Sequence, residues 1–185
     1  SKPVPAPFPV SDDCLIVDST GFLARTDAPA RVLIVGGGVI GVEFAAMRAA
    51  LGLHTTIAEA TDRLLPNMDE ELSAFAQKKL SDLGVRVLCK TFVTSADAHG
   101  ASFRQRENIF SDSFDMIVCA VGRRANTDSL DLSRAYIETA RGGFIPVDDC
   151  CRTTVPGVYA IGDVNGRAML AHAASEQGRT VSENI

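Results

Sequence analysis

The stretch RVLIVGGGVIGVEF, residues 31–44, decides the fold of this chain. Residues 32–35 are continuously apolar and mostly β-branched, as expected of a strand buried on both faces. Three glycines follow at 36–38, and apolar residues resume at Val39. A buried strand that runs through glycines into a helix is typical of α/β proteins with a parallel sheet.

The residues after the glycines predict an amphipathic helix. Ile40, Phe44, Met47 and Leu51 recur at steps of four, three and four residues, which places them on one face of a helix. We expect this face to be buried. Gly52 predicts the end of the helix.

The same alternation continues downstream. Residues 53–59 predict a second strand, and residues 85–89 predict a third after Gly84. Between them a second helix should begin with Asp69 as its N-cap. This order predicts an α/β fold with a doubly wound, Rossmann-like parallel sheet. The expected buried stripe of the second helix is Leu72, Phe75, Leu80 and Leu83.

The second half of the chain has a different character. Residues 91–110 show short strand-like pieces without a helical period, which predicts an antiparallel meander with Gly100 at a turn. Residues 114–121 predict another fully buried strand. Residues 142–164 predict two short strands around a turn at Pro156 and Gly157, and residues 169–185 predict a helix.

Proline occupies every second position from Pro3 to Pro9. This favours an extended surface connector with few hydrogen-bond donors. A short helical turn should then begin at Ser19 or Thr20. We expect residues 1–26 to be a connector, residues 27–147 to form a nucleotide-binding domain and residues 148–185 to belong to another domain.

The segment Gly36 to Gly41 matches the pattern G-x-G-x-x-G in the required context of a strand before it and a helix after it. Gly36 permits a tight turn, Gly38 lets the backbone approach a pyrophosphate, and Gly41 lets the helix pack close to the strand. The helix N-terminus offers free N–H groups to the phosphates. This segment therefore predicts dinucleotide binding.

Glu59 closes the second strand, 23 residues after Gly36 and close to the roughly 20 that the pattern expects. A carboxylate accepts hydrogen bonds from a ribose 2′-hydroxyl and repels a 2′-phosphate, so NAD is favoured over NADP. Arg63 could serve a phosphate, but we expect a solvated side chain. Glu43 has two interpretations, a position near the cofactor or compensation of the helix dipole.

The composition excludes some classes of partner and leaves others open. A formal net charge of −5 argues weakly against nucleic acid or an anionic membrane as the main partner. No apolar run approaches the roughly 18 residues of a membrane-spanning helix. The cysteines lack a C-x-x-C pair, and we interpret adjacent Cys150 and Cys151 as ordinary thiols in a reducing, cytoplasmic setting. No metal ligands are predicted.

Several stretches, taken in order, resemble the flavin-dependent pyridine-nucleotide disulfide oxidoreductases. Within that family the chain looks most like the members that oxidise dihydrolipoyl groups in 2-oxo-acid dehydrogenase complexes, on the basis of MLAH at 169–172 and of Glu59. Ala125 stands in a loop where the family usually has proline. The resembling stretches are RVLIVGGGVIGVEFA (31–45), DRLLPNMDEEL (62–72), AVGRRANT (120–127), RTTVPGVYAIGDV (152–164) and MLAHAASEQG (169–178).

The resemblance implies roles at the NAD site. Glu43 would approach the nicotinamide side, and Glu59 would hold the adenosine ribose. Val93 would line the adenine pocket, although it could also be a core residue. The nicotinamide half would pass Gly122. The implied NAD loop is Gly36, Gly37, Gly38, Val39, Ile40, Gly41, Val42 and Glu43.

The resemblance also implies part of an FAD site. Asp163 would hold the flavin ribityl chain, or alternatively serve as an N-cap. Backbone N–H groups at the start of the last helix would face the flavin ring, although His172 could be an ordinary surface histidine. The residues implied at this helix start are Met169, Leu170, Ala171 and His172.

The resemblance implies a parent flavoenzyme in which thiolates reduce a disulfide, electrons reach FAD and a hydride passes to NAD⁺. The family's FAD glycine loop, two-cysteine helix and interface domain do not lie within these 185 residues. We therefore expect an NAD-binding domain with partial FAD-domain segments at 1–26 and 148–185, taken from a longer protein. The fragment should bind NAD(H), bind FAD weakly or not at all, and be inactive in the thiol step.

The expected partners are NAD(H), the remainder of the parent flavoenzyme and a complex with lipoyl-bearing acyltransferases, with no nucleic acid or membrane. The open edge of VYAIG, residues 158–162, also predicts self-association through the tail. Two alternatives stay open. One is a fragment of a soluble transhydrogenase or NADH oxidase-like flavoprotein, and the other is a non-catalytic binding module.

Overall fold

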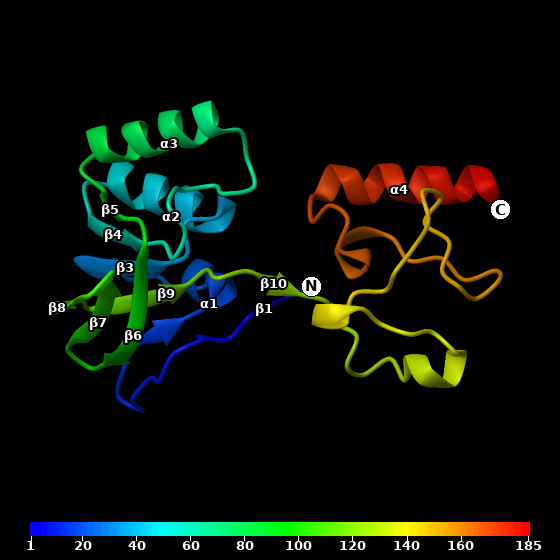
Figure 1. The fold of residues 1–185 in the computed structure, drawn as a ribbon, viewed down its shortest axis with the longest axis horizontal. Coiled ribbons are helices and arrows are strands. Elements are labelled where there is room, and N and C mark those ends of the chain that lie inside the picture. The colour runs from blue at the N-terminus through cyan, green and yellow to red at the C-terminus, as the bar shows by residue number, and fades with distance from the viewer. The chain divides into compact units, whose positions relative to one another are not determined.

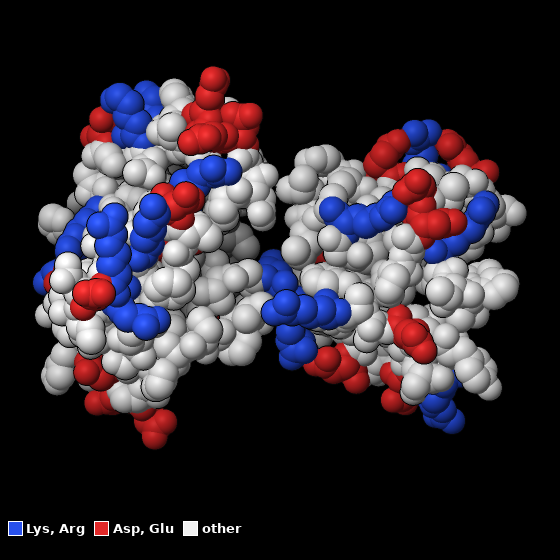
Figure 2. Space-filling model, viewed as in Figure 1, with Lys and Arg blue, Asp and Glu red and all other residues white.

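The computed structural model describes all residues from Ser1 to Ile185 and divides into two compact units (Figure 1). The larger unit is Pro3–Gly122, and the smaller unit combines Ser1–Lys2 with Arg123–Ile185. These borders differ from the expected ones, because residues 3–26 belong to the larger unit and residues 123–147 to the smaller. Acidic and basic side chains are interspersed over the visible face of each unit (Figure 2).

A five-stranded parallel sheet forms the larger unit, with the strand order β2-β9-β3-β4-β5. The central strand β3 pairs with β4 on one side and with β9 on the other. The predicted α/β fold with a parallel sheet is therefore confirmed. Its strands are β2 (Ile16–Val17), β3 (Arg31–Val35), β4 (His54–Ala58), β5 (Arg86–Leu88) and β9 (Met116–Cys119).

Different layers cover the two faces of this sheet. Helices α2 (Val39–Ala50) and α3 (Glu70–Asp82) lie on one side, and a three-stranded meander lies on the other (Figure 1). The meander is antiparallel throughout, as predicted. Its strands are β6 (Thr91–Asp97), β7 (Gly100–Gln105) and β8 (Asn108–Ser113).

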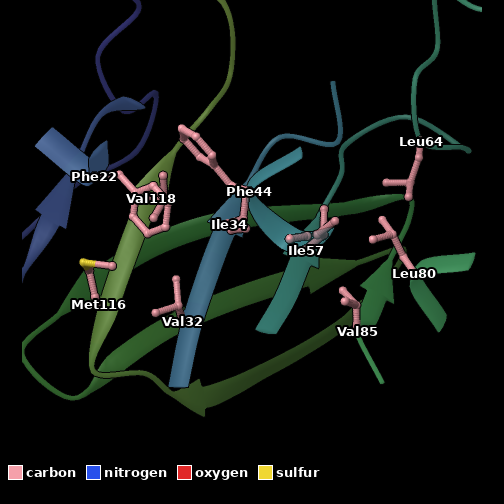
Figure 3. Packing of buried hydrophobic residues seen from close by; sticks show 11 residues of the cluster. Phe22, Val32, Ile34, Phe44, Ile57, Leu64, Leu80, Val85, Met116 and Val118 are labelled. Atoms are coloured by element: carbon pink, nitrogen blue, oxygen red, sulfur yellow. The ribbon is translucent and has the colours of Figure 1, made fainter. Parts of the chain in front are cut away.

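The central strand β3 contributes to two hydrophobic cores. Val32 and Ile34 pack in the cluster beneath the helices, with Phe44 of α2 (Figure 3). Leu33 and Val35 pack in the cluster beneath the meander. Successive side chains of a strand point to opposite faces, so a strand covered on both faces needs an unbroken apolar run.

The buried face of α2 differs from the expected one. Phe44 is buried, but Met47 and Leu51 are 44% and 70% exposed. Arg48 is buried instead, and its guanidinium donates to the carbonyl oxygen of Pro29 at 2.7 Å and to Thr55 Oγ1 at 3.2 Å. The face turned to the sheet comprises Gly41, Phe44, Ala45 and Arg48.

Helix α3 begins as predicted, since the Asp69 carboxylate accepts a hydrogen bond from the N–H of Glu71. The predicted buried stripe is mostly wrong. Leu80 is buried, whereas Leu72, Phe75 and Leu83 are each more than half exposed. A polar residue, Ser73, is buried beside Leu80 because its hydroxyl donates to the carbonyl of Leu65.

Residues 4–11, which we call the strap, are attached to the larger unit at both ends. The N–H of Val4 donates to the carbonyl of Gly122 at 3.0 Å. Further along, the N–H of Ser11 donates to the carbonyl of Ala96 in β6, and the N–H of Ala96 donates to the carbonyl of Pro9, both at 3.0 Å. The strap is therefore part of the larger unit and not a separate connector. The short helix α1 (Ser19–Leu23) follows, with Asp18 as its N-cap.

The smaller unit has little regular structure before its final helix. Its core is small and is built on Ile137, Ile145 and Ala160. The two strands predicted around Pro156 are absent, and an isolated bridge between Arg152 and Tyr159 stands in their place. The final helix is present as predicted. The helices are η1 (Leu132–Ala135), η2 (Arg141–Gly143), η3 (Gly162–Asn165) and α4 (Ala171–Asn184).

Strands β1 (Lys2–Pro3) and β10 (Arg123–Arg124) pair in a two-stranded ribbon. None of the helices combines the length and apolar character that crossing a membrane requires.

Candidate dinucleotide-binding site

Three glycines of the G-x-G-x-x-G segment, two before α2 and one in its first turn, are required by the packing of the chain itself. A Cβ at Gly36 would lie 2.4 Å from the carbonyl oxygen of Ala120, and the residue has a φ of +107°. A Cβ at Gly41 would lie 2.0 Å from the carbonyl oxygen of Gly36. At Gly37 the nearest atom would be a methyl carbon of Leu64, at 2.5 Å. Larger residues cannot occupy these positions without moving the backbone or the core.

Gly38 lacks any such constraint. Its φ is −73°, and no atom of the chain lies within 4 Å of a Cβ placed there. Gly38 is also the N-cap of α2, and no side chain caps this helix. The first N–H groups of α2 have no acceptor within the helix and are available to an anion. The open space therefore lies where a phosphate can approach the helix end.

Glu59, which follows β4, is 8% exposed and is fixed against the glycine loop. One carboxylate oxygen accepts from the N–H of Gly37 at 2.6 Å, and the other accepts from the N–H of Thr61 at 2.7 Å. An ionised carboxylate has about four acceptor sites, so each oxygen can accept a further hydrogen bond from a ligand. The acid is thus held beside the loop with acceptor capacity remaining.

A pocket of about 380 Å³ brings together Gly36, Glu59 and Val93, which sequence reasoning had placed at one site. The strap residue Phe8 and the β6 residue Phe92 also line this pocket and were not predicted. Both are distant in sequence from the glycine loop. No local pattern marks them as site residues, since their contribution depends on where the strap and the meander pack.

The family model for pyridine nucleotide-disulphide oxidoreductases matches residues 3–178. The chain belongs to this family. It is 39% identical over 182 residues to a dihydrolipoyl dehydrogenase of Chlamydia pneumoniae, covering 98% of this chain and 40% of that protein. It is 38% identical over 180 residues to the dihydrolipoyl dehydrogenase of Bacillus subtilis strain 168, covering 96% and 39%.

Solved structures of the family agree with the fold. The HOCl-induced flavoprotein disulfide reductase RclA from Escherichia coli superposes with a TM-score of 0.88 at 30% identity, covering 100% of this chain and 42% of that one. LpdA from Mycobacterium tuberculosis superposes with a TM-score of 0.86 at 26% identity, covering 99% and 40%. The chain thus spans about two-fifths of the length of these relatives.

The other residues that the sequence predicted for the NAD loop of this chain lie along the start of α2. Val39 and Glu43 are exposed, and Ile40 and Val42 are half-buried. Glu43 lies beyond the first turn, which contains no acid, so the dipole interpretation receives no support. Gly122 follows β9 with a φ of +127° and open space beside it.

Arg63 is not the solvated side chain that we expected. It is half-buried, and its Nε is a buried atom without a hydrogen-bond partner. It lines a different pocket from Glu59, one that it shares with Ser73 and Lys78 of α3. Arg63 is therefore separate from the candidate dinucleotide site.

The residues that the family resemblance assigns to FAD lie in the smaller unit. Asp163 lies within η3, whose N-cap is Ile161, so Asp163 is not an N-cap. Gln177 of α4 connects the two elements, since its side-chain oxygen accepts from the N–H of Gly162 at 2.7 Å. Leu170 is the N-cap of α4, which has no side-chain cap. Met169, Leu170, Ala171 and His172 are all exposed.

All five cysteines are free thiols. Burial raises the pKa of Cys14, Cys89 and Cys119, and at Cys89 the nearby carboxylates of Glu59 and Asp62 raise the pKa further. A raised pKa keeps a thiol protonated near neutral pH and lowers its nucleophilicity. These three thiols are therefore poor nucleophiles, and of the three only Cys119 is fully buried.

Proposed function

We propose that this chain is the NAD(H)-binding part of a flavoenzyme that oxidises dihydrolipoyl groups with NAD⁺. The observation that carries the NAD site is the contrast within the glycine loop. Gly36 and Gly41 are required by the fold, whereas Gly38 faces open space at an uncapped helix N-terminus. Since packing does not explain the glycine at position 38, we attribute it to a pyrophosphate that approaches the backbone there and leaves no room for a side chain.

Glu59 supports NAD as the dinucleotide, in preference to NADP. Its carboxylate is held by two backbone N–H groups beside the loop and retains acceptor capacity for ribose hydroxyls. A 2′-phosphate at the same position would face a buried negative charge. The role of the chain at this end is to orient the adenosine half.

FAD is the proposed second cofactor, held by Asp163 and by the first-turn N–H groups of α4 together with the rest of the parent protein. Those N–H groups have no side-chain cap and can donate to an electron-rich ring. Bound FAD supplies the hydride that NAD⁺ accepts. Support also comes from the structural relative RclA, which is described as a flavoprotein disulfide reductase.

The dihydrolipoyl substrate is supported by the relatives named dihydrolipoyl dehydrogenase in Chlamydia pneumoniae and Bacillus subtilis. The proposed partners are the remainder of the flavoenzyme and a complex with lipoyl-bearing acyltransferases, in the cytoplasm. We expect the 185-residue chain alone to be inactive in the thiol step. The raised pKa values of Cys14, Cys89 and Cys119 support this, because the nucleophile in disulfide exchange is the thiolate.

Calorimetric titration of the purified chain with NADH and NADPH tests the proposal. NADH should bind at least about tenfold more tightly than NADPH, because only NADPH places a phosphate against Glu59. The same preparation should form no NADH from dihydrolipoamide and NAD⁺.

The possible outcomes separate the alternatives. Absence of NADH binding by the folded chain would contradict the proposal and favour a non-catalytic binding module. Dihydrolipoamide-dependent NADH formation by the chain alone would contradict the assignment of the thiol step to the rest of the parent. A full-length parent that reduces NAD⁺ without any redox disulfide would favour the transhydrogenase or NADH oxidase-like alternative.

A further inference from the structure

We propose that the strap, residues 4–11, is a wall of the base pocket, and that this pocket holds adenine by contact with its aromatic face and does not read its hydrogen-bonding edge. Phe8 and Phe92 supply the contacts. This inference rests on the proposed NAD(H) site, because Glu59 marks the ribose end of the same pocket.

The strap can serve as a wall because both of its ends are fixed to the larger unit. Val4 is hydrogen bonded to Gly122 at one end, and Pro9 and Ser11 are hydrogen bonded to Ala96 at the other. Alternating prolines restrict the backbone between these anchors. Pro7 and Phe8 lie between the anchors and line the pocket. The wall is therefore preorganised and loses little conformational entropy when a ligand binds.

The two aromatic rings are held differently. Phe8 is half-buried and packs against the core cluster beneath the meander. Phe92 is 48% exposed on β6, and the guanidinium of Arg104 lies 5.6 Å from its ring centroid. Both rings line the pocket with Val93. Aromatic and aliphatic walls favour a flat heterocycle, since every nucleobase has a π face that can stack.

The polar side chains of the pocket are not available to the edge of the base. Only Glu59 and Thr91 among the lining residues carry polar side chains. The Thr91 hydroxyl donates to the carbonyl of Cys89 at 3.0 Å and accepts from Gln105 Nε2 at 2.9 Å. Thr91 is 1% exposed, so this hydroxyl cannot turn to a ligand without breaking a buried network.

The consequence is a pocket that selects by shape. A site that hydrogen bonds a base edge discriminates strongly against analogues that lack the matching group, because its own polar atoms are left unpaired. Here the remaining acceptor capacity of Glu59 is assigned to the ribose hydroxyls, and no other lining side chain offers a free donor or acceptor to the edge of a purine. We therefore expect replacement of the adenine amino group by a carbonyl oxygen to cost little affinity.

Titrations of the 185-residue chain with NADH, ADP-ribose and reduced nicotinamide hypoxanthine dinucleotide test this inference. Phe92→Ala and Phe8→Leu should each weaken NADH and ADP-ribose binding by about five- to tenfold. Phe8→Leu keeps an apolar side chain in the core cluster while removing the ring face. In the wild-type chain the hypoxanthine dinucleotide should bind within about threefold of NADH.

Phe75→Ala is the matched control, because Phe75 is an exposed phenylalanine of α3 that lies outside this pocket. It should leave all three affinities unchanged. Thermal melting by circular dichroism establishes that each variant is folded.

Wild-type affinity for ADP-ribose in both folded Phe92→Ala and Phe8→Leu would overturn the role of the two rings. Loss of more than about tenfold with the hypoxanthine dinucleotide would overturn selection by shape. Either result would leave the proposed function intact, provided that the wild-type chain binds NADH. Failure of the wild-type chain to bind NADH would instead contradict the proposed function itself.

Discussion

Gly38 differs from the other glycines of the G-x-G-x-x-G segment, because the packing of the chain does not require a glycine at this position. Its neighbours are glycines because the chain leaves no room for a side chain. Gly38 has an ordinary φ and free space, so alanine would fit the fold there.

We therefore predict that Gly38→Ala changes the free energy of unfolding by less than about 1 kcal/mol, the range of N-cap substitutions. NADH affinity should fall about tenfold or more, because the methyl group occupies the space of the pyrophosphate. Gly41→Ala is the comparison. Its Cβ would lie 2.0 Å from the carbonyl oxygen of Gly36, so it should cost about 2 kcal/mol or more of stability. Urea denaturation and NADH titration measure both; normal affinity in Gly38→Ala would contradict the phosphate assignment.

Glu59 combines a structural role with the proposed ligand role. Glu59→Ala leaves the N–H groups of Gly37 and Thr61 without their acceptor, which should cost about 1–3 kcal/mol of stability. We also expect weaker NADH binding and a narrower preference for NADH over NADPH. Paired titrations with both nucleotides measure this. A folded variant with the wild-type affinity and selectivity would remove Glu59 from the ribose site.

The sequence could predict some residues of the candidate site better than others. Gly36, Gly41 and Glu59 follow from residue types at fixed spacings, because the turn, the close helix approach and the acid all lie within one strand–helix–strand unit. Phe8 and Phe92 could not be found in this way. Their position in the pocket depends on hydrogen bonds between the strap and Ala96, which are far apart in sequence.

At the scale of elements, the sequence predicted the order and type of most helices and strands but not which face of each helix is buried. Hydrophobicity placed Met47 of α2 and its C-cap Leu51 against the sheet, yet both are exposed. Gly41 and Ala45 face the sheet because small side chains allow the close approach that the glycine loop imposes. Arg48 is buried on that face because backbone carbonyls accept its hydrogen bonds, and a hydrophobicity pattern contains no such information.

The buried thiol of Cys119 in β9 predicts how the free energy of unfolding changes at alkaline pH. Burial raises the pKa of Cys119 above its ordinary value of 9.0. A group whose pKa is raised on folding contributes stability that is complete below its unfolded pKa and is lost as pH rises through its folded pKa. The free energy of unfolding should therefore be level up to about pH 8 and decline above pH 9.

Urea denaturation at a series of pH values from neutral to about 10.5 measures this decline. Other groups also titrate in that range, so Cys119→Ala is the control. Its stability should decline less steeply than that of the wild-type chain. Equal slopes for the two proteins would show that Cys119 does not contribute.

At the scale of the whole molecule, the two units have unequal cores. The larger unit has one large cluster of buried residues on each face of its sheet. The smaller unit has one cluster of three buried apolar residues, and α4 has no buried residue. Local stability follows buried apolar contact. We predict faster amide hydrogen exchange in 123–185 than in β3 and β9, measured by mass spectrometry. Equal protection across both units would contradict this difference.

Self-association through the tail remains a prediction, with a different physical basis from the one that the sequence suggested. An open strand edge at 158–162 is not available, because that segment forms only an isolated bridge. Exposed apolar side chains support the prediction instead, since Ile161, Met169 and Leu170 are 43%, 43% and 51% exposed. Exposed apolar side chains can be covered by association with a second copy.

Multi-angle light scattering over a range of concentrations should therefore detect dimers that increase with concentration. The double substitution Met169→Ser and Leu170→Ser should shift the chain toward monomer, because it replaces two exposed apolar side chains ahead of α4. Met47→Ser is the matched control, since Met47 has a similar exposure of 44% in the larger unit. A wild-type chain that stays monomeric at the highest concentration would rule out the tail as an association surface. Its exposed apolar residues would then be explained by contacts with the rest of the proposed parent flavoenzyme.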